Sequence, residues 1–164
     1  MILQLSEPVP LAMSHVLTDF TCREPVLDEW LKHRAMNNQL SGASRTFVVA
    51  DQDNQVFGFY AMAAGAVSHQ VATSSVRRNM PDPVPVMVLA RLAVDHRAQD
   101  IKLGAALLQN AVNRAVAVSQ NTGVRALLVH ALHENAQRFY EHYGFQVSPM
   151  HPMTLMLRLS TVKM

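Results

Sequence analysis

The stretch VLARLAVDHRAQDIKLGAALL, residues 88–108, joins an apolar run, a tight polar segment and a helical pattern. Val84 to Asp95 is almost entirely apolar, as expected of a central strand covered on both faces, with Pro85 at its beginning. From about Gly104 to Val118, leucine, alanine and valine recur at helical spacing. Because the first N–H groups of a helix are unpaired, this strand, loop and helix together can form an anion-binding site. An ordinary turn before a helix is the alternative, since one glycine there does not distinguish the two.

Patterns in the rest of the chain predict a mixed sheet with helices on both faces. Helical spacing indicates one helix from Pro25 to near Ser41-Gly42 and a shorter one, His133 to Tyr143, ended by Gly144. Further strands are expected at Thr46–Ala50, Gln55 to about Ser68, Val124–Leu132 and Thr154–Ser160, the first two as an antiparallel hairpin. The polar, proline-containing connection from His69 to Pro83 is expected to lack regular structure.

The composition limits the class of protein that this sequence can form. With 164 residues, 49% hydrophobic and 16% charged, residues 1–164 are expected to form one globular domain. The lone Cys22 excludes an internal disulfide and favours a reducing compartment. We see no signal peptide and no apolar run near the ~18 residues that span a membrane, so we expect a cytoplasmic protein. A net charge of +2 is too small to establish a nucleic-acid partner.

The quoted stretch resembles the central motif of the GNAT acetyltransferases, in which an apolar strand ending Ala-Val-Asp leads into (Arg/Gln)-x-x-Gly-x-(Gly/Ala) and a helix. Gln99 and Gly104 match the first and last motif positions, whereas Lys102 stands where the family prefers glycine. The resemblance implies an α/β (mixed α+β) GNAT fold whose mostly antiparallel sheet is splayed at an acetyl-CoA site. It also implies that the loop holds the cofactor's pyrophosphate, with contacts at Gln99, Asp100, Ile101, Lys102, Leu103, Gly104 and Ala105.

Two loop residues leave the strength of acetyl-CoA binding open. Asp100 brings a negative charge near the diphosphate, and Lys102 brings a compensating cation. If Lys102 needs a positive φ, the conformation costs about 1 kcal/mol, which weakens affinity about tenfold or less. We therefore expect the loop to bind the cofactor still.

Longer segments narrow the resemblance. LDEWLKHRAMNNQLSGASRTFVV, FYAMAAGAVS, RRNMPDPVPVMVLARLAVD, GVRALLVHAL and AQRFYEHYGF are similar to GNAT-type toxins of bacterial toxin–antitoxin modules. That subgroup acetylates the α-amino group of aminoacyl-tRNA and so stops translation. The partners implied are the aminoacyl-tRNA acceptor end, a ribbon-helix-helix antitoxin and a second copy of the chain in a homodimer.

Acetyl transfer to an amine needs an uncharged amine, a donor to the oxyanion and a proton for the leaving thiolate. The resemblance implies Tyr140 as the proton donor; a core role for Tyr140 and donation by Tyr143 are the alternatives. It likewise implies that the backbone of Leu92, Ala93 and Val94 binds the pantetheine arm. Asn135 is either a further coenzyme contact or a helix cap.

Basic residues are candidates for contacts with tRNA phosphates. The resemblance favours Arg77 and Arg78, and Arg45, Arg91, Lys32 and Arg34 extend the set, although Lys32 and Arg34 also suit ordinary solvated helix positions. No metal is expected, because His130, His133 and His142 complete no ligand set. Two alternatives stay open: a GNAT enzyme for a small amine or protein N-terminus, and a decayed enzyme that only binds its partner.

Overall fold

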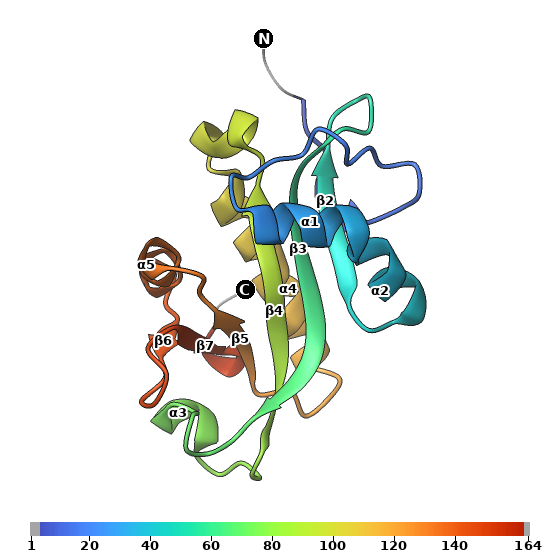
Figure 1. Cartoon of the computed structure of the whole chain (residues 1–164). Coiled ribbons are helices and arrows are strands. Elements are labelled where there is room, and N and C mark those ends of the chain that lie inside the picture. The colour runs from blue at the N-terminus through green and yellow to red at the C-terminus, as the bar shows by residue number, and fades with distance from the viewer. Residues whose placement is uncertain (1–3, 163–164) are drawn as a thin grey trace. The chain divides into compact units, whose positions relative to one another are not determined.

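The computed structural model describes residues 4–162. Its seven strands form one mixed sheet in the order β1-β2-β3-β4-β5-β7-β6, which confirms the expected fold class (Figure 1). The strands are β1 Val9–Pro10, β2 Arg45–Ala50, β3 Val56–Val67, β4 Val84–Val94, β5 Ala126–His130, β6 Gln146–Val147 and β7 Thr154–Arg158. The helices are α1 Pro25–His33, α2 Ala35–Ser41, α3 Ser74–Arg77, α4 Leu103–Ser119 and α5 Glu134–His142, with 3₁₀ helices η1 His96–Ile101 and η2 Leu159–Thr161.

The chain divides into two compact units. Unit 1 comprises Met1–Ala63 and Ala90–Ala111, and unit 2 comprises Ala64–Leu89 and Val112–Met164. Strands β3 and β4 and helix α4 each contribute residues to both units.

In unit 1, helices cover both faces of the sheet. Leu27, Leu31 and Ala35 from α1 and α2 pack with Val48 and Phe59 of the antiparallel β2–β3 hairpin. The first turns of α4 lie against the other face, at Gly58 of β3. A Cβ at Gly58 would lie 3.0 Å from side-chain atoms of both Leu103 and Leu107, so the glycine allows this close approach. The predicted first helix is broken at Arg34 and ends at Gly42, which has a φ of 80°.

In unit 2, β5 pairs parallel with β4 from Val86 to Leu89 and antiparallel with β7. The core here contains side chains from β3, β4, β5, β7 and the 69–83 connection, namely Val67, Ala72, Val76, Val84, Val86, Ala126, Leu128 and Met156. The expectation that residues 69–83 lack regular structure is wrong, because α3 forms one helical turn after Thr73. Its buried Val76 anchors that turn, and the prolines of this segment come only after it.

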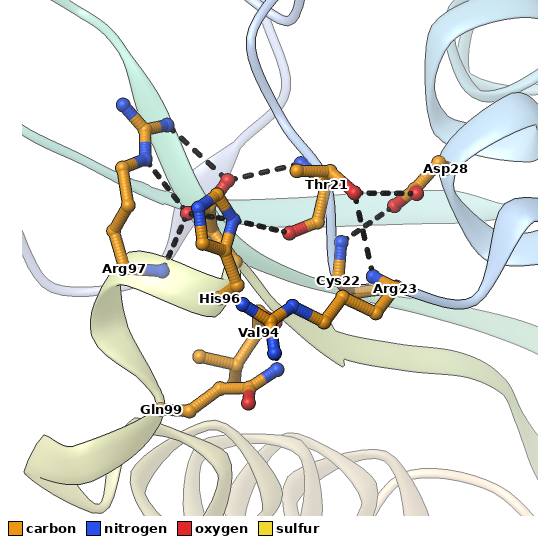
Figure 2. Close-up of polar contacts among 9 residues, drawn as sticks. Thr21, Cys22, Arg23, Asp28, Val94, His96, Arg97 and Gln99 are labelled. Carbon is orange, nitrogen blue, oxygen red and sulfur yellow. Dashed lines mark hydrogen bonds and ion pairs between the residues drawn. The ribbon is translucent and has the colours of Figure 1, made fainter.

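A buried carboxylate fixes the end of β4. Asp95 is fully buried, and its two carboxylate oxygens accept hydrogen bonds from the Thr21 N–H at 2.9 Å, the Arg97 N–H at 2.8 Å and the Arg97 Nε at 2.8 Å. Its own N–H donates to the Phe57 carbonyl at 2.8 Å. Thr21, His96 and Arg97, each of which contacts the Asp95 carboxylate, lie close to one another in Figure 2. Asp95 therefore ties β3, the loop before α1 and η1 to one point.

The electrostatics of Asp95 follow from these bonds. Burial alone would raise its pKa, but the hydrogen bonds from the Arg97 side chain and from the Thr21 and Arg97 amides outweigh burial and lower it. The Arg97 guanidinium also lies 4.5 Å from the centroid of the Phe57 ring, a cation–π distance.

The junction between η1 and α4 passes through Lys102, whose φ is 59°. This left-handed conformation favours glycine, the residue that the related motif carries at this position. The conformation costs Lys102 about 1 kcal/mol. The lysine is thus tolerated at a modest cost to stability.

We expect Asp95→Asn to lower the free energy of unfolding at pH 7 by about 2–3 kcal/mol, because it removes a buried charged acceptor of several hydrogen bonds. Urea unfolding measures this. The matched control is Asp100→Asn, an exposed aspartate in the same segment, which we expect to change stability by no more than about 0.5 kcal/mol.

The effect of Asp95→Asn should also depend on pH. Because the pKa of Asp95 is lower in the folded chain, its stabilisation is present above the unfolded value of about 3.9 and is lost as the pH falls through the folded pKa. The difference between wild type and Asp95→Asn should therefore shrink below about pH 4. A difference that stays constant from neutral to acid pH would contradict this assignment.

For Lys102, we expect Lys102→Gly to be at least as stable as wild type, because relief of strain offsets the entropy that glycine adds to the unfolded chain. Lys102→Val should lose about 1 kcal/mol or more, since a β-branched residue fits a positive φ poorly. Lys102→Asn, which tolerates this conformation and lacks the charge, is the control and should resemble wild type. Equal stability of the glycine and valine variants in urea unfolding would refute the strain.

Candidate active site

The N-terminus of α4 presents three backbone donors. The first bond of the α4 ladder joins the Ala106 N–H to the Lys102 carbonyl at 3.2 Å. Leu103, Gly104 and Ala105 precede that bond, so the helix itself offers their N–H groups no acceptor. The positive end of the helix dipole lies at these amides, which makes them suited to a negatively charged group.

The amides just before α4 differ from the sequence expectation. Ile101, one of the expected pyrophosphate contacts, is the last residue of η1. In a 3₁₀ helix each N–H bonds the carbonyl three residues earlier, as Ala98 does to Asp95 at 2.9 Å. The donor set of the loop is therefore narrower than expected and is concentrated on the first turn of α4.

The side chains of this loop are mostly at the surface. Gln99, Asp100, Ile101 and Lys102 are exposed, whereas Leu103 is buried against Gly58. The Gln99 Nε2 donates to the Val94 carbonyl at 3.2 Å, which links the loop to the end of β4. The loop thus carries one exposed cation and one exposed carboxylate beside the α4 amides.

The end of β4 carries the three residues proposed for the pantetheine arm. Ala93 is buried in the core with α1, while Leu92 and Val94 are half-buried. The ladder between β4 and β5 runs from Val86 to Leu89, and β4 continues through Val94. The strand therefore extends past its ladder with β5 over the segment that contains Leu92, Ala93 and Val94.

In unit 2, Tyr140 of α5 is 7% exposed. Its ring centroid lies 5.2 Å from that of Phe139 and 5.5 Å from that of Phe145. Burial in this aromatic cluster raises the pKa of the phenol, so Tyr140 stays protonated at neutral pH. Tyr143, the alternative proton donor, is 44% exposed and contacts the rings of Phe139 and His142.

Asn135 lies in the first turn of α5. The capping alternative for Asn135 is wrong, because His133 caps the helix: its Nδ1 accepts from the Ala136 N–H at 3.2 Å. The Asn135 Oδ1 accepts a hydrogen bond from the Arg138 guanidinium. Asn135 therefore has its side chain on the exposed part of the helix start.

The six basic residues predicted to contact tRNA are divided between the units. Unit 1 contains Lys32, Arg34, Arg45 and Arg91, and unit 2 contains Arg77 and Arg78. Arg34, Arg45, Arg77 and Arg78 are exposed and Lys32 is half-buried. The Arg45 guanidinium donates to the Gln39 carbonyl at 2.9 Å, and that of Arg77 donates to the His69 carbonyl at 3.4 Å.

Arg91 differs from the other basic residues. Its guanidinium lies 5.0 Å from the centroid of the Trp30 ring, and its Nη1 donates to the Ala90 carbonyl at 2.9 Å. Within residues 4–162 its buried Nε has no partner, and burial lowers its pKa. Arg91 therefore packs against Trp30, and its Nε–H group is a hydrogen-bond donor without an acceptor in the described residues.

Cys22 is a free, buried cysteine. Burial, followed by a hydrogen bond to Asp28, raises the pKa of the Cys22 thiol to about 12, so this thiol is a poor nucleophile. In the described part of the chain, His, Cys, Asp and Glu form no group suited to a metal ion. Among the same residues, none of the helices combines the length and apolarity needed to cross a bilayer.

Asp95 was not among the residues predicted from the sequence to be important, although an aspartate just before a helical segment is a capping signal.

A comparison with protein-family models matches residues 43–147 to the acetyltransferase (GNAT) domain. The matched range contains β4, the loop, the start of α4 and Tyr140. A tRNA-acetylating toxin of Mycobacterium tuberculosis is 46% identical over 158 residues, covering 96% of this chain and 95% of the relative.

Solved structures share the fold. A crystal structure of a KacT variant superposes with a TM-score of 0.90 at 22% identity, covering 96% of both chains. AtaT complexed with acetyl-methionyl-tRNAfMet gives a TM-score of 0.88 at 24% identity with the same coverage. The chain belongs to the GNAT acetyltransferase family and is an acetyl-CoA-dependent N-acetyltransferase.

Proposed function

We propose that this enzyme is a toxin that acetylates the α-amino group of aminoacyl-tRNA and thereby blocks translation. The observation that carries this proposal is the 46% identity, over 96% of the chain, to a tRNA-acetylating toxin. The AtaT complex with an acetylated aminoacyl-tRNA shows that a protein of this fold accommodates such a product. The donor and acid groups described above supply the chemistry that the reaction requires.

The α4 amides fit the diphosphate of acetyl-CoA. Leu103, Gly104 and Ala105 offer donors at the positive end of a 17-residue helix, and the exposed Lys102 adds a cation beside them. Gln99, Asp100 and Ile101 complete the proposed contact segment. Acetyl-CoA supplies the reactive thioester; this chain's residues orient it and provide the proton.

For the pantetheine arm, we assign the backbone of Leu92, Ala93 and Val94 at the end of β4, with one N–H donating to the thioester oxygen. This role uses the main chain and so makes no demand on the apolar side chains. Asn135, which does not cap α5, is assigned as a further coenzyme contact.

Tyr140 is assigned as the general acid. Its raised pKa keeps the phenol protonated, so its Oη can give a proton to the departing sulfur. No strong base is required, because an α-amino group has a reference pKa of about 7.7–8.0 and is partly neutral at cellular pH. Positioning of the amine can then supply much of the rate.

Arg77 and Arg78, with Arg91, Arg45, Lys32 and Arg34, are assigned to the phosphates of the acceptor stem. Such contacts give affinity and salt dependence rather than sequence readout. We further propose that the chain acts as a single GNAT domain in a cytoplasmic homodimer, neutralised by a ribbon-helix-helix antitoxin.

The decisive experiment mixes the protein with acetyl-CoA and a pool of charged tRNA, followed by nuclease digestion and mass spectrometry. The expected product is acetylated aminoacyl-adenosine. Acetylation of a small amine or of a protein N-terminus, with none on charged tRNA, would assign another substrate. No binding of acetyl-CoA in calorimetry would indicate a decayed enzyme.

Tyr140→Phe should lower kcat about 100-fold or more, because a general acid contributes on this order. Tyr143→Phe, which alters an exposed tyrosine close to α5, is the matched control and should keep activity. In the wild type, kcat/KM should rise as the amine deprotonates through about pH 8 and show no loss from Tyr140 ionisation below about pH 10. Full activity of Tyr140→Phe would remove it from the mechanism.

Arg77→Glu combined with Arg78→Glu should raise KM for charged tRNA about tenfold or more, since each loses a phosphate contact and adds repulsion. KM for acetyl-CoA should not change. Steady-state kinetics with each substrate varied in turn make the comparison. Equal loss for both substrates would point to misfolding, and no loss for either would exclude this pair from tRNA binding.

A further inference from the structure

Arg125 holds the segment that carries Arg77 and Arg78. Its Nε donates to the Val76 carbonyl at 3.1 Å, and its Nη2 donates to the carbonyls of Ser75 at 3.0 Å and Arg78 at 3.1 Å. The last carbonyls of a helix lack intrahelical donors, and an arginine side chain satisfies them. The guanidinium of Arg125 therefore fixes the C-terminal end of α3 and the start of the following loop.

The backbone of Arg125 is itself anchored in the sheet of unit 2. Its N–H donates to the Pro85 carbonyl at 2.9 Å, and its carbonyl accepts from the Leu159 N–H at 3.1 Å. Three of its five guanidinium N–H groups are used on the three carbonyls of α3 and Arg78. The two on Nη1 lie outside these bonds and can serve a ligand.

Two more arginines lie next to this group. Arg158 sits on β7 opposite Ala126, the residue after Arg125, and its Nε donates to the Ser160 hydroxyl at 2.9 Å. The Arg78 carbonyl is bonded to Arg125, and its side chain is exposed. After burial, the positive charges of Arg158 and Arg78 lower the pKa of Arg125, so the three charges repel one another.

In the part of the chain that the structure describes, this cluster carries a net positive charge without a partner carboxylate. Within residues 4–162, no Asp or Glu forms an ion pair with Arg78, Arg125 or Arg158. Guanidinium groups present planar pairs of donors that match phosphate oxygens. Three of them together, with donors left over and no carboxylate, have the chemistry of a polyphosphate or nucleic-acid site.

We propose that Arg78, Arg125 and Arg158 form a phosphate-binding cluster for the backbone of the RNA substrate. In it, Arg158 contacts phosphate directly, and Arg125 both contacts phosphate and positions the Arg77–Arg78 segment. This proposal rests on the proposed function, the acetylation of charged tRNA. It adds two residues, far apart in sequence from Arg77 and Arg78, to the RNA-binding surface of unit 2.

Affinity for deacylated tRNA, measured by fluorescence anisotropy at several salt concentrations, tests the direct contact. Arg158→Gln loses one phosphate contact, so affinity should fall about tenfold at low salt and the slope of log K against log salt should shrink by about 0.7–0.9. Arg114→Gln, on α4, is the charge-matched control and should keep the wild-type slope. A wild-type slope in Arg158→Gln, or an equal change in Arg114→Gln, would overturn the assignment.

A double-mutant cycle tests the positioning role. Arg125→Lys keeps the charge but loses the planar fork that bridges three carbonyls, so it should weaken tRNA binding. If Arg125 acts through Arg78, the loss in Arg125→Lys with Arg78→Gln should be smaller than the product of the two single losses. Strictly multiplicative losses would show that Arg125 does not act through Arg78.

Two measurements distinguish failure of the cluster proposal from failure of the proposed function, the acetylation of charged tRNA. KM for acetyl-CoA should be unchanged in Arg158→Gln; an increase there, with tRNA affinity unchanged, would assign the cluster to coenzyme phosphates and overturn the RNA assignment. If wild type acetylates charged tRNA while Arg158→Gln and Arg125→Lys bind tRNA normally, only the cluster proposal fails. If wild type neither binds nor acetylates tRNA, both proposals fail.

Discussion

The position of the proposed cofactor loop depends on one buried carboxylate. Asp95 is the residue directly before η1, and its carboxylate accepts hydrogen bonds from Thr21 and Arg97. Its own N–H donates to the Phe57 carbonyl. A charge this deeply buried is tolerable only because these donors compensate for its lost hydration. The path from β4 into η1, and hence the place where α4 begins, follows from satisfying Asp95.

The loop can depart from its family's glycine pattern because the proposed ligands of the diphosphate are main-chain groups. The proposed ligands are main-chain N–H groups of Leu103, Gly104 and Ala105, and a side chain at Lys102 does not remove them. What Lys102 changes is the local conformational energy, because its φ of 59° is costly for a residue with a Cβ. The same substitution places an ammonium group beside the proposed diphosphate site, where it favours the anion.

Periodic patterns predicted the parts of the fold that are decided locally. The β2–β3 hairpin, the apolar β4, helix α4 and the left-handed Gly144 were all predicted from spacing and turn chemistry. The specific side-chain contacts that stabilise these elements were not predictable from the sequence. The stacking of Arg91 on Trp30 depends on which residues the folded chain brings together. The cap of α5 by His133 is a local contact, but the sequence pattern did not distinguish it from a cap by Asn135. The anchoring of α3 by Arg125, about 50 residues later, left no signal in the local sequence.

We propose that the first-turn amides of α4 hold the diphosphate of the coenzyme. Amide NMR of the ¹⁵N-labelled protein during titration with coenzyme A tests it most directly, since each N–H reports separately. We expect large shifts and slowed hydrogen exchange at Leu103, Gly104 and Ala105, with smaller changes at Ala98 and Ile101 inside η1. Saturation by coenzyme A that leaves those three amides unshifted would contradict it.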